Sequence, residues 1–252
     1  MAHSVKPRKR ASVLYLYGIS LPSDFVLPSI IGLDGHAPVE TLTCGPFTCW
    51  ISRVAAAFTG DFSARMQDLD WLAEVTQRHH AATAAIAERA DILPARFGTV
   101  FLNEASLCKS VSAQAAHLRS DLKRIKGNQE WGVKVFAVPQ ESVVDARPRT
   151  GRAYLQAKSA GMRKTLSRKP DQAIEKLAHS LRRLSVATAD GGKIGGGRKD
   201  LEFQMAILVQ RSNRRKLESL LGRFAEKWKQ KHTIECTGPW PPYSFVSGMA
   251  QK

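Results

Sequence analysis

A segment of nine residues, Thr237–Phe245, constrains the fold of this chain more than any other stretch. Three prolines and one glycine restrict its backbone, so the side chains of Trp240, Tyr243 and Phe245 project from a nearly rigid frame. The end of a chain usually frays and carries no such restriction. A rigid aromatic tail therefore predicts a segment that docks onto its own domain, onto a partner, or both.

Composition limits the class of protein. The chain has 252 residues, of which 43% are hydrophobic, and this is enough for one large or two small globular domains. Its longest apolar run is far shorter than the roughly 20 residues that cross a bilayer. The basic segment Lys6–Arg10 is not followed by a signal-peptide cleavage site. We therefore expect a cytoplasmic protein without membrane contact.

The four cysteines predict neither a metal site nor a disulfide framework. Cys44, Cys49, Cys108 and Cys236 include no CxxC pair and no cysteine–histidine spacing typical of zinc. We expect reduced, buried thiols and no disulfide inside a cell. Because Cys44 and Cys49 flank a predicted turn, they are the pair that oxidising conditions outside the cell would bridge.

Positive charge is concentrated in the second half of the chain. The net charge is +16, of which residues 1–150 contribute +3 and residues 151–252 contribute +13. Such a basic body implies an acidic partner, which can be a nucleic acid, an anionic membrane or an acidic protein surface. Cations at a helix start also oppose the helix dipole, so a cluster there indicates a contact surface. The candidate contact residues of this cluster are Arg211, Arg214, Arg215 and Lys216.

Hydrophobic periodicity in the first half predicts an α+β domain over residues 12–128, after a disordered basic arm at 1–11. Strands are expected at 12–19, 39–44, 47–54 and 93–101, and helices at 63–89 and 104–126. The helix at 63–89 is expected to bury one stripe, which consists of Leu69, Leu72, Ala73, Thr76, His79, His80 and Thr83.

The second half predicts a separate α+β domain over residues 129–252. Strands are expected at 131–138, 201–210 and 233–236, with a less distinct one near 187–197, where a Gly-rich stretch at 191–197 indicates a flexible loop. One helix, at 151–187, is interrupted at Pro170, and another follows Ser212 as its cap. The helices are expected to bury Ile174, Leu177, Leu181 and Leu184, and Leu217, Leu220, Leu221, Phe224 and Trp228. This β-α-β-β-α-β order is the ferredoxin-like, split βαβ pattern, with residues 237–252 as its rigid aromatic tail.

No motif in the sequence indicates catalysis. Asp68 and Asp70 do not face each other on a helix, and the adjacent His79 and His80 lack the i, i+4 spacing of zinc-binding helices. The aspartates suit the first turn of a helix, where negative charge is favourable. The glycines at 191–197 lack the spacing of a phosphate-binding loop. We therefore expect no catalytic residue, no metal, no cofactor and no small-molecule substrate.

Specific nucleic-acid recognition is not favoured either. The strand at 201–210 has one aromatic residue, Phe203, and Trp131 and Phe136 point to opposite faces of their strand. Without a stacking platform, the basic charge supports only nonspecific phosphate contact. A nonspecific nucleic-acid or anionic-surface binding protein is therefore the alternative to a protein-binding function.

Several stretches resemble one known family, the gas vesicle accessory proteins GvpF and GvpL. The similar blocks follow the family's order and cover nearly the whole chain: Tyr15–Gly18, Asp68–His80, Leu93–Phe101, Glu130–Phe136 with Gly151–Leu155, and Gly238–Phe245. The resemblance implies an α+β N-terminal domain and a ferredoxin-like C-terminal domain. It also implies a non-enzymatic accessory or minor structural protein, cytoplasmic and associated with gas vesicles. Its partners would be the hydrophobic shell subunit or other Gvp proteins during nucleation and assembly. The resemblance does not separate the F type from the L type.

For partner contact, we predict that the three aromatic side chains of the tail act together with the basic cluster. An aromatic tail and the apolar seam Ile174–Leu184 would offer grooves to a partner that hides an apolar face. The basic second half would steer the partner's approach. The candidate partner-contact residues are Arg211, Arg214, Arg215, Lys216, Trp240, Tyr243 and Phe245.

Overall fold

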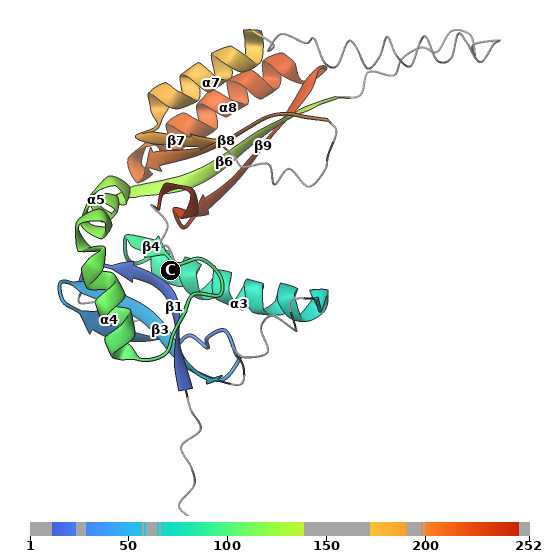
Figure 1. Ribbon diagram of the computed structural model, residues 1–252. Helices are drawn as coiled ribbons and strands as arrows, with labels where there is room; N and C mark the ends of the chain where they lie inside the picture. The colour runs from blue at the N-terminus through green and yellow to red at the C-terminus, as the bar shows by residue number, and fades with distance from the viewer. Residues whose placement is uncertain are drawn as a thin grey trace, which may run out of the picture. The chain divides into compact units, whose positions relative to one another are not determined.

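The structure is a computed structural model. It describes residues 12–23, 29–56, 58, 65, 67–138, 172–190, 198 and 200–246. By its internal contacts the chain divides into two compact units, Met1–Glu130 with Pro239–Lys252, and Trp131–Gly238. Each unit holds one β-sheet, so the fold is mixed α+β with two sheets, and the described residues form five α-helices (Figure 1).

The first unit is built on an antiparallel sheet with strand order β2-β3-β1-β4, in which β5 also pairs with β1. Its strands are β1 (Ser12–Ser20), β2 (Glu40–Cys44), β3 (Phe47–Ala55), β4 (Ile92–Pro94) and β5 (Val100–Phe101). Its helices are α3 (Leu69–Ala87), α4 (Glu104–Ala113) and α5 (Ala115–Ile125). The central strand β1 is buried along almost its whole length.

A close backbone approach at Gly18 fixes the pairing of β1 with β4. Gly18 lies opposite Pro94, at a shift in the register between β1 and β3. A Cβ atom at this position would lie 2.6 Å from the carbonyl oxygen of Leu93 and 2.5 Å from the Ile92 side chain. Only glycine therefore fits without moving β4.

The second unit has a four-stranded sheet with order β7-β8-β6-β9. Its elements are β6 (Asn128–Ala137), α7 (Gln172–Leu184), β7 (Ala187–Asp190), β8 (Leu201–Gln210), the 3-10 turn η1 (Arg211–Asn213), α8 (Arg214–Trp228) and β9 (His232–Trp240). A second 3-10 turn, η2 (Tyr243–Phe245), follows β9 in the chain. Helices α7 and α8 lie on one face of the sheet (Figure 1). Their apolar sides form one core with alternate residues of β6 and β8, among them Val133, Leu177, Ile207 and Leu217.

Most of the expected elements are present, with five differences. The helix expected at 63–89 begins only at Leu69, where Asp68 caps it. The strand expected at 93–101 is two short strands, β4 and β5, and the helix expected at 104–126 breaks at Gln114 into α4 and α5. Strand β9 continues to Trp240, four residues beyond the expected end, and Ser212 lies in η1 while Asn213 is the N-cap of α8. The predicted arm 1–11, the predicted helical residues 151–171 and the Gly-rich loop 191–197 lie outside the described residues.

Helix α3 buries a face that matches the expected stripe only in part, at His79 and Thr83. Its buried face contains Trp71, Val75, His79 and Ile86, whereas Leu69 is 75% exposed. Asp68 caps this helix, because its side chain accepts a hydrogen bond from the Trp71 backbone N–H. Leu69 is then the first helical residue, on the solvent side.

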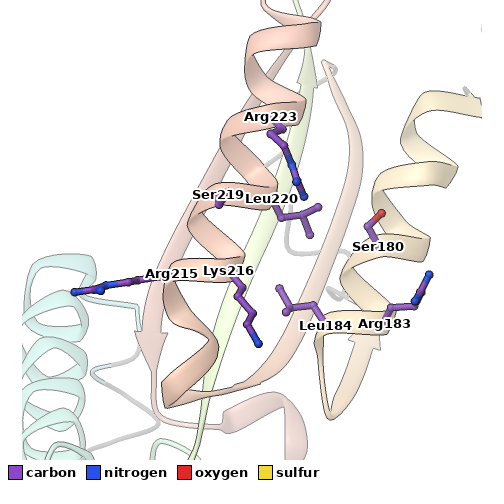
Figure 2. A pocket seen from close by; sticks show the side chains of 8 residues that line it. All are labelled: Ser180, Arg183, Leu184, Arg215, Lys216, Ser219, Leu220 and Arg223. Carbon is purple, nitrogen blue, oxygen red and sulfur yellow. The ribbon is translucent and has the colours of Figure 1, made fainter.

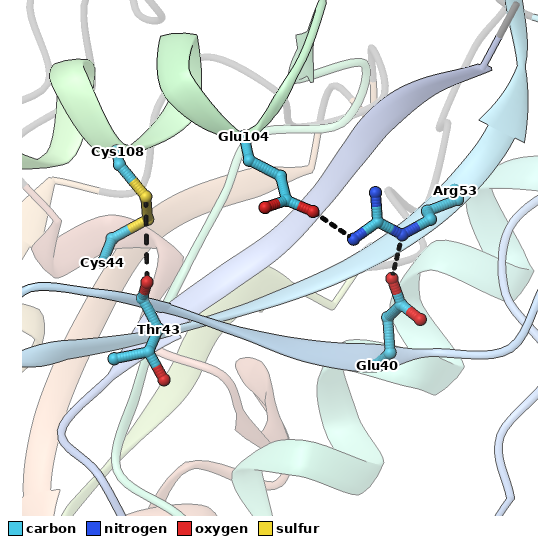
Figure 3. A network of polar contacts seen from close by, with 6 residues as sticks. All are labelled: Glu40, Thr43, Cys44, Arg53, Glu104 and Cys108. Atoms are coloured by element: carbon cyan, nitrogen blue, oxygen red, sulfur yellow. Dashed lines mark hydrogen bonds and ion pairs between the residues drawn. A yellow bond between two sulfur atoms is a disulfide. The ribbon is translucent and has the colours of Figure 1, made fainter.

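Helix α4 is tied to the β2–β3 hairpin by a covalent bond and by charge (Figure 3). Cys44 and Cys108 form a disulfide, with their Cα atoms 4.9 Å apart. Arg53 pairs with Glu40 at 2.6 Å and with Glu104, in the first turn of α4, at 2.5 Å. The expectation of four reduced thiols is therefore wrong for Cys44 and Cys108. The pairing of Cys44 with Cys49, expected under oxidising conditions, is also wrong.

Sequence spacing could not reveal this bond, because the two cysteines lie 64 residues apart. We expect non-reducing peptide mapping of the full chain to recover a linked peptide pair containing Cys44 and Cys108, with Cys49 and Cys236 alkylated as free thiols. Alkylation of all four cysteines without a reductant would contradict the disulfide.

Candidate functional site

The rigid tail docks on the first unit through a buried polar chain centred on His79. Tyr15 Oη lies 2.8 Å from His79 Nδ1, and Tyr243 Oη of the tail lies 3.2 Å from His79 Nε2. Tyr15 Oη already accepts from the Gly98 backbone N–H, so we assign the Tyr15 hydroxyl as the donor to Nδ1. We therefore assign the imidazole proton to Nε2, which donates it to Tyr243.

Burial makes this imidazole a poor base. His79 is 3% exposed, and desolvation lowers its pKa from 6.5 to about 4, with a smaller contribution from the neighbouring His80. Burial also raises the pKa of Tyr15 and of Tyr243. His79, Tyr15 and Tyr243 are therefore neutral near pH 7. His79 forms hydrogen bonds with both tyrosine hydroxyls.

Three further contacts hold the tail. The Ser244 backbone N–H and hydroxyl donate to the two carboxylate oxygens of Glu130, at 2.9 and 2.7 Å. Arg124 of α5 donates to the Phe245 carbonyl oxygen at 2.5 Å. The pKa of Glu130 is raised by burial, and the bonds from Ser244 partly offset that rise. The tail thus forms hydrogen bonds with α3, α5 and the start of β6.

The three aromatic side chains predicted for partner contact differ in exposure. Phe245 is buried, at 6% exposed, and Tyr243 is half-buried against His79. Trp240 is 40% exposed, with its ring centroid 5.1 Å from that of His80. Of the predicted tail contacts, Trp240 therefore offers the most surface to a partner. The sequence analysis assigned residues 237–252 to the second domain, whereas the contacts of Pro239 and beyond group them with the first unit.

The predicted basic cluster lies around the start of α8 in the second unit. Arg214 forms an ion pair with Glu218 at 2.9 Å, and its guanidinium lies 5.5 Å from the Trp131 ring centroid. Arg211 lies in the preceding turn η1. Arg215 and Lys216 instead line a groove between α7 and α8 (Figure 2).

This α7/α8 groove is apolar at its floor and cationic at its edges. Its volume is about 560 Å³, and it is lined by Ser180, Arg183, Leu184, Arg215, Lys216, Ser219, Leu220 and Arg223. Lys216, Leu220 and Arg223 of α8 face Ser180 and Leu184 of α7, while Arg183 and Arg215 extend away from the groove (Figure 2). No carboxylate lines it.

The four cations of the groove have no anionic partner within the described ranges, although ion pairs form elsewhere on the same helix. Glu218 is engaged by Arg214, and Glu226 by Lys229. The residues three and four positions after Lys216 are Ser219 and Leu220, so Lys216 has no carboxylate at pairing distance on that side. Glu218 and Glu226 lie three positions after Arg215 and Arg223, but they pair with Arg214 and Lys229. Like charges therefore remain close together, which is unfavourable for the isolated chain.

Most of the apolar seam Ile174–Leu184, which was expected to offer a groove to a partner, is buried in the core of the second unit. Ile174, Leu177 and Leu181 are buried in the core of the second unit, and Leu184 alone of the seam also lines the groove. Sequence reasoning missed Arg183 and Arg223 as groove residues. The sequence did contain a signal for them, because Arg183 directly precedes Leu184 and Arg223 lies three residues after Leu220.

The aromatic residues of the central strands do not form a stacking surface in the described part of the second unit. Trp131 belongs to the core, and Phe203 packs against that core. Phe136 is 4% exposed, and the Arg198 guanidinium lies 3.9 Å from its ring centroid. The described residues also contain no group of three or more His, Cys, Asp or Glu side chains placed to hold a metal ion. None of the helices they form is long and apolar enough to cross a membrane.

Comparisons with known proteins identify the family. The model of the family "Gas vesicle synthesis protein GvpL/GvpF" matches residues 13–247. Gas vesicle protein L of a Streptomyces strain is 30% identical, with 94% of each chain covered. Gas vesicle protein F2 of Halobacterium salinarum is 23% identical, with 93% of this chain and 92% of that protein covered.

Solved structures share the fold. The crystal structure of GvpF from Anabaena sp. matches with a TM-score of 0.71 at 19% identity, and the match covers 94% of this chain and 96% of that one. GvpF from Microcystis aeruginosa matches with a TM-score of 0.70 at 17% identity, with coverages of 93% and 99%. The match to the family model and the similarity to gas vesicle protein L extend over nearly the whole sequence. The chain therefore belongs to the GvpL/GvpF family of gas vesicle synthesis proteins, and its role lies in gas vesicle formation.

Proposed function

We propose that this protein is a non-enzymatic accessory or minor structural protein that binds other gas vesicle proteins during nucleation and assembly. Its direct partners are the hydrophobic shell subunit or other Gvp proteins, and it acts in the cytoplasm at the growing vesicle. The observation that carries this proposal is the α7/α8 groove, where four cations without described anionic partners surround an apolar floor. Such a surface suits a protein partner that presents both apolar and acidic side chains.

The second unit supplies a rigid platform for this contact. We assign it to the ferredoxin-like, split βαβ class, because its strand order β7-β8-β6-β9 and its β-α-β-β-α-β sequence support that assignment. Both helices are anchored in one core, so the groove residues on their outer sides keep a fixed spacing. We propose Trp240 as a separate contact residue, with Tyr243 and Phe245 holding the tail in place.

The alternative is nonspecific binding to nucleic acid or to an anionic surface. The cations of the groove, which have no anionic partner among the described residues, support this alternative. Phosphate contact would not, however, bury the apolar side chains of Leu184 and Leu220. A gel shift with duplex and single-stranded DNA at physiological salt discriminates the two functions. Tight binding there would favour the alternative.

Charge reversal tests the proposed function. We expect the variant Arg215→Glu/Lys216→Glu/Arg223→Glu to bind its gas vesicle partner about tenfold more weakly, with a flatter dependence of the association rate on salt. The measurement is co-expression with each Gvp protein in turn, followed by affinity purification and association kinetics at two salt concentrations.

Lys227→Glu/Lys229→Glu/Lys231→Glu is the matched control, since it makes the same change of charge on residues outside the groove. We expect it to retain partner binding. An association rate that does not depend on salt in the unmodified protein would count against a role for these cations.

A further inference from the structure

The side chains along α8 form a regular stripe in the α7/α8 groove. Lys216, Ser219, Leu220 and Arg223 follow one another at spacings of three, one and three residues, so they share one face of the helix. Lys216 and Arg223 are seven residues apart, which is about 10 Å along the axis at 1.5 Å per residue. Leu220 lies between the two cations. The stripe therefore places Leu220 between two cations, Lys216 and Arg223, over two helical turns.

Helix α7 repeats part of this pattern on the opposite side of the groove. Ser180 and Leu184 are four residues apart and face α8 (Figure 2). Leu184 and Leu220 are each only partly buried by the core, so the groove leaves apolar surface in contact with water. A ligand that covers this surface must bring apolar groups of its own.

The undescribed segments of this chain do not offer an acidic occupant. Residues 139–171 contain eight Lys or Arg and three Asp or Glu, and residues 1–11 contain four basic residues and no acidic one. Residues 191–197 and 199 add two basic residues and no acidic one, residues 24–28 and 59–64 contain one aspartate each, and residues 247–252 contain no acidic residue. Because these segments carry few acidic residues and the longest of them is net basic, charge complementarity favours anionic groups from another molecule.

We propose that the α7/α8 groove binds an acidic amphipathic helix of a partner protein. This helix presents carboxylates seven residues apart toward Lys216 and Arg223, with apolar side chains three or four residues from each carboxylate toward Leu184 and Leu220. A third helix lying across two antiparallel or crossed helices buries its apolar stripe by ordinary ridge-into-groove packing. The proposal rests on the proposed function, because it specifies the chemistry of the partner.

Synthetic helices test the pattern directly. The test peptide has 16 residues, is stabilised as a helix, and carries glutamates at positions i and i+7 and leucines at i+3 and i+4. It bears a fluorescent label, and its binding to the full chain is measured by fluorescence anisotropy. The matched peptide has the same composition and net charge in a scrambled order that breaks the stripe. We expect the patterned peptide to bind at least about tenfold more tightly than the scrambled one. Equal affinities would overturn the proposal, because charge alone would then explain the binding.

Protein variants locate the binding site. Lys216→Glu/Arg223→Glu is expected to weaken the patterned peptide about tenfold or more, whereas Lys227→Glu/Lys231→Glu, with the same change of charge outside the groove, changes it less than about twofold. Equal loss in both double variants would overturn the groove as the site. Tighter binding of a 15-nucleotide single-stranded DNA than of the patterned peptide would overturn a protein partner in favour of nucleic acid.

Failure of this inference can be told apart from failure of the proposed function. If the patterned peptide does not bind but co-purification of Gvp proteins still depends on Lys216 and Arg223, the partner surface is not an acidic helix and the proposed function stands. If the peptide binds as expected while co-purification is unchanged in the double variant, the inference stands and the proposed use of the groove fails.

Discussion

Replacing Phe245 by alanine is expected to lower the free energy of unfolding of the first unit by about 3 kcal/mol. The Phe245 side chain is buried, and alanine would remove most of its apolar contact while leaving the backbone bond from Arg124 to the Phe245 carbonyl in place. The substitution therefore isolates the packing of the ring. Urea denaturation, with hydrogen exchange to locate the change, measures the effect.

The position of the change matters as much as its size. We expect faster exchange in α3 and α5, which contact the tail, and unchanged exchange in α7 and α8, which share a core of their own. Trp240→Ala is the comparison, because Trp240 is 40% exposed against 6% for Phe245, so its loss should cost less than the loss of the Phe245 ring. A loss of protection confined to α7 and α8 would show that the tail stabilises the other unit.

The sequence predicted the elements of the second unit well because its helices have strongly amphipathic patterns. In α8, Leu217, Leu221 and Trp228 alternate with charged residues, so only one face can be buried. In α3, the stretch after His80 is rich in alanine, and alanine does not distinguish an inner from an outer face. The capping bond of Asp68 sets the start of α3 at Leu69, six residues after the expected one.

The contacts of the tail could be predicted only in part. Its prolines and aromatics indicate docking, and the structure places that docking on the first unit. Glu130 and Ser244 are 114 residues apart, and no local pattern links a carboxylate in a strand to a hydroxyl beyond the last strand. The residues that line the α7/α8 groove could not be predicted either. Hydrophobic periodicity indicates which face of each helix is buried, but not which outer side chains of one helix lie next to those of the other.

The second large effect concerns pH. His79 has a pKa of about 4 in the folded protein and 6.5 ordinarily, so between these values the unfolded chain binds a proton that the folded state excludes. Stability therefore falls as the pH drops through this window. From pH 7 to pH 5 the loss is about 2 kcal/mol, and it approaches about 3 kcal/mol below pH 4.

Glu130 acts in the opposite direction. Its pKa is raised in the folded state, so protonation of this carboxyl favours folding as the pH drops. Tyr15, Tyr17 and Tyr243 lie against His79, have raised pKa values and remain neutral in this range. The net slope of stability with pH thus combines a large term from His79 with an opposing one from Glu130.

The variant His79→Gln separates these two terms. Glutamine keeps an uncharged polar group beside Tyr15 and Tyr243 but cannot gain the proton. We expect the unmodified protein to lose about 2 kcal/mol more than this variant between pH 7 and pH 5, by urea denaturation at each pH. Parallel stability curves for the two proteins would mean that His79 already binds its proton in the folded state. The imidazole would then carry a charge between two tyrosine hydroxyls, and the assignment of a neutral hydrogen-bonded chain beneath the tail would have to be abandoned.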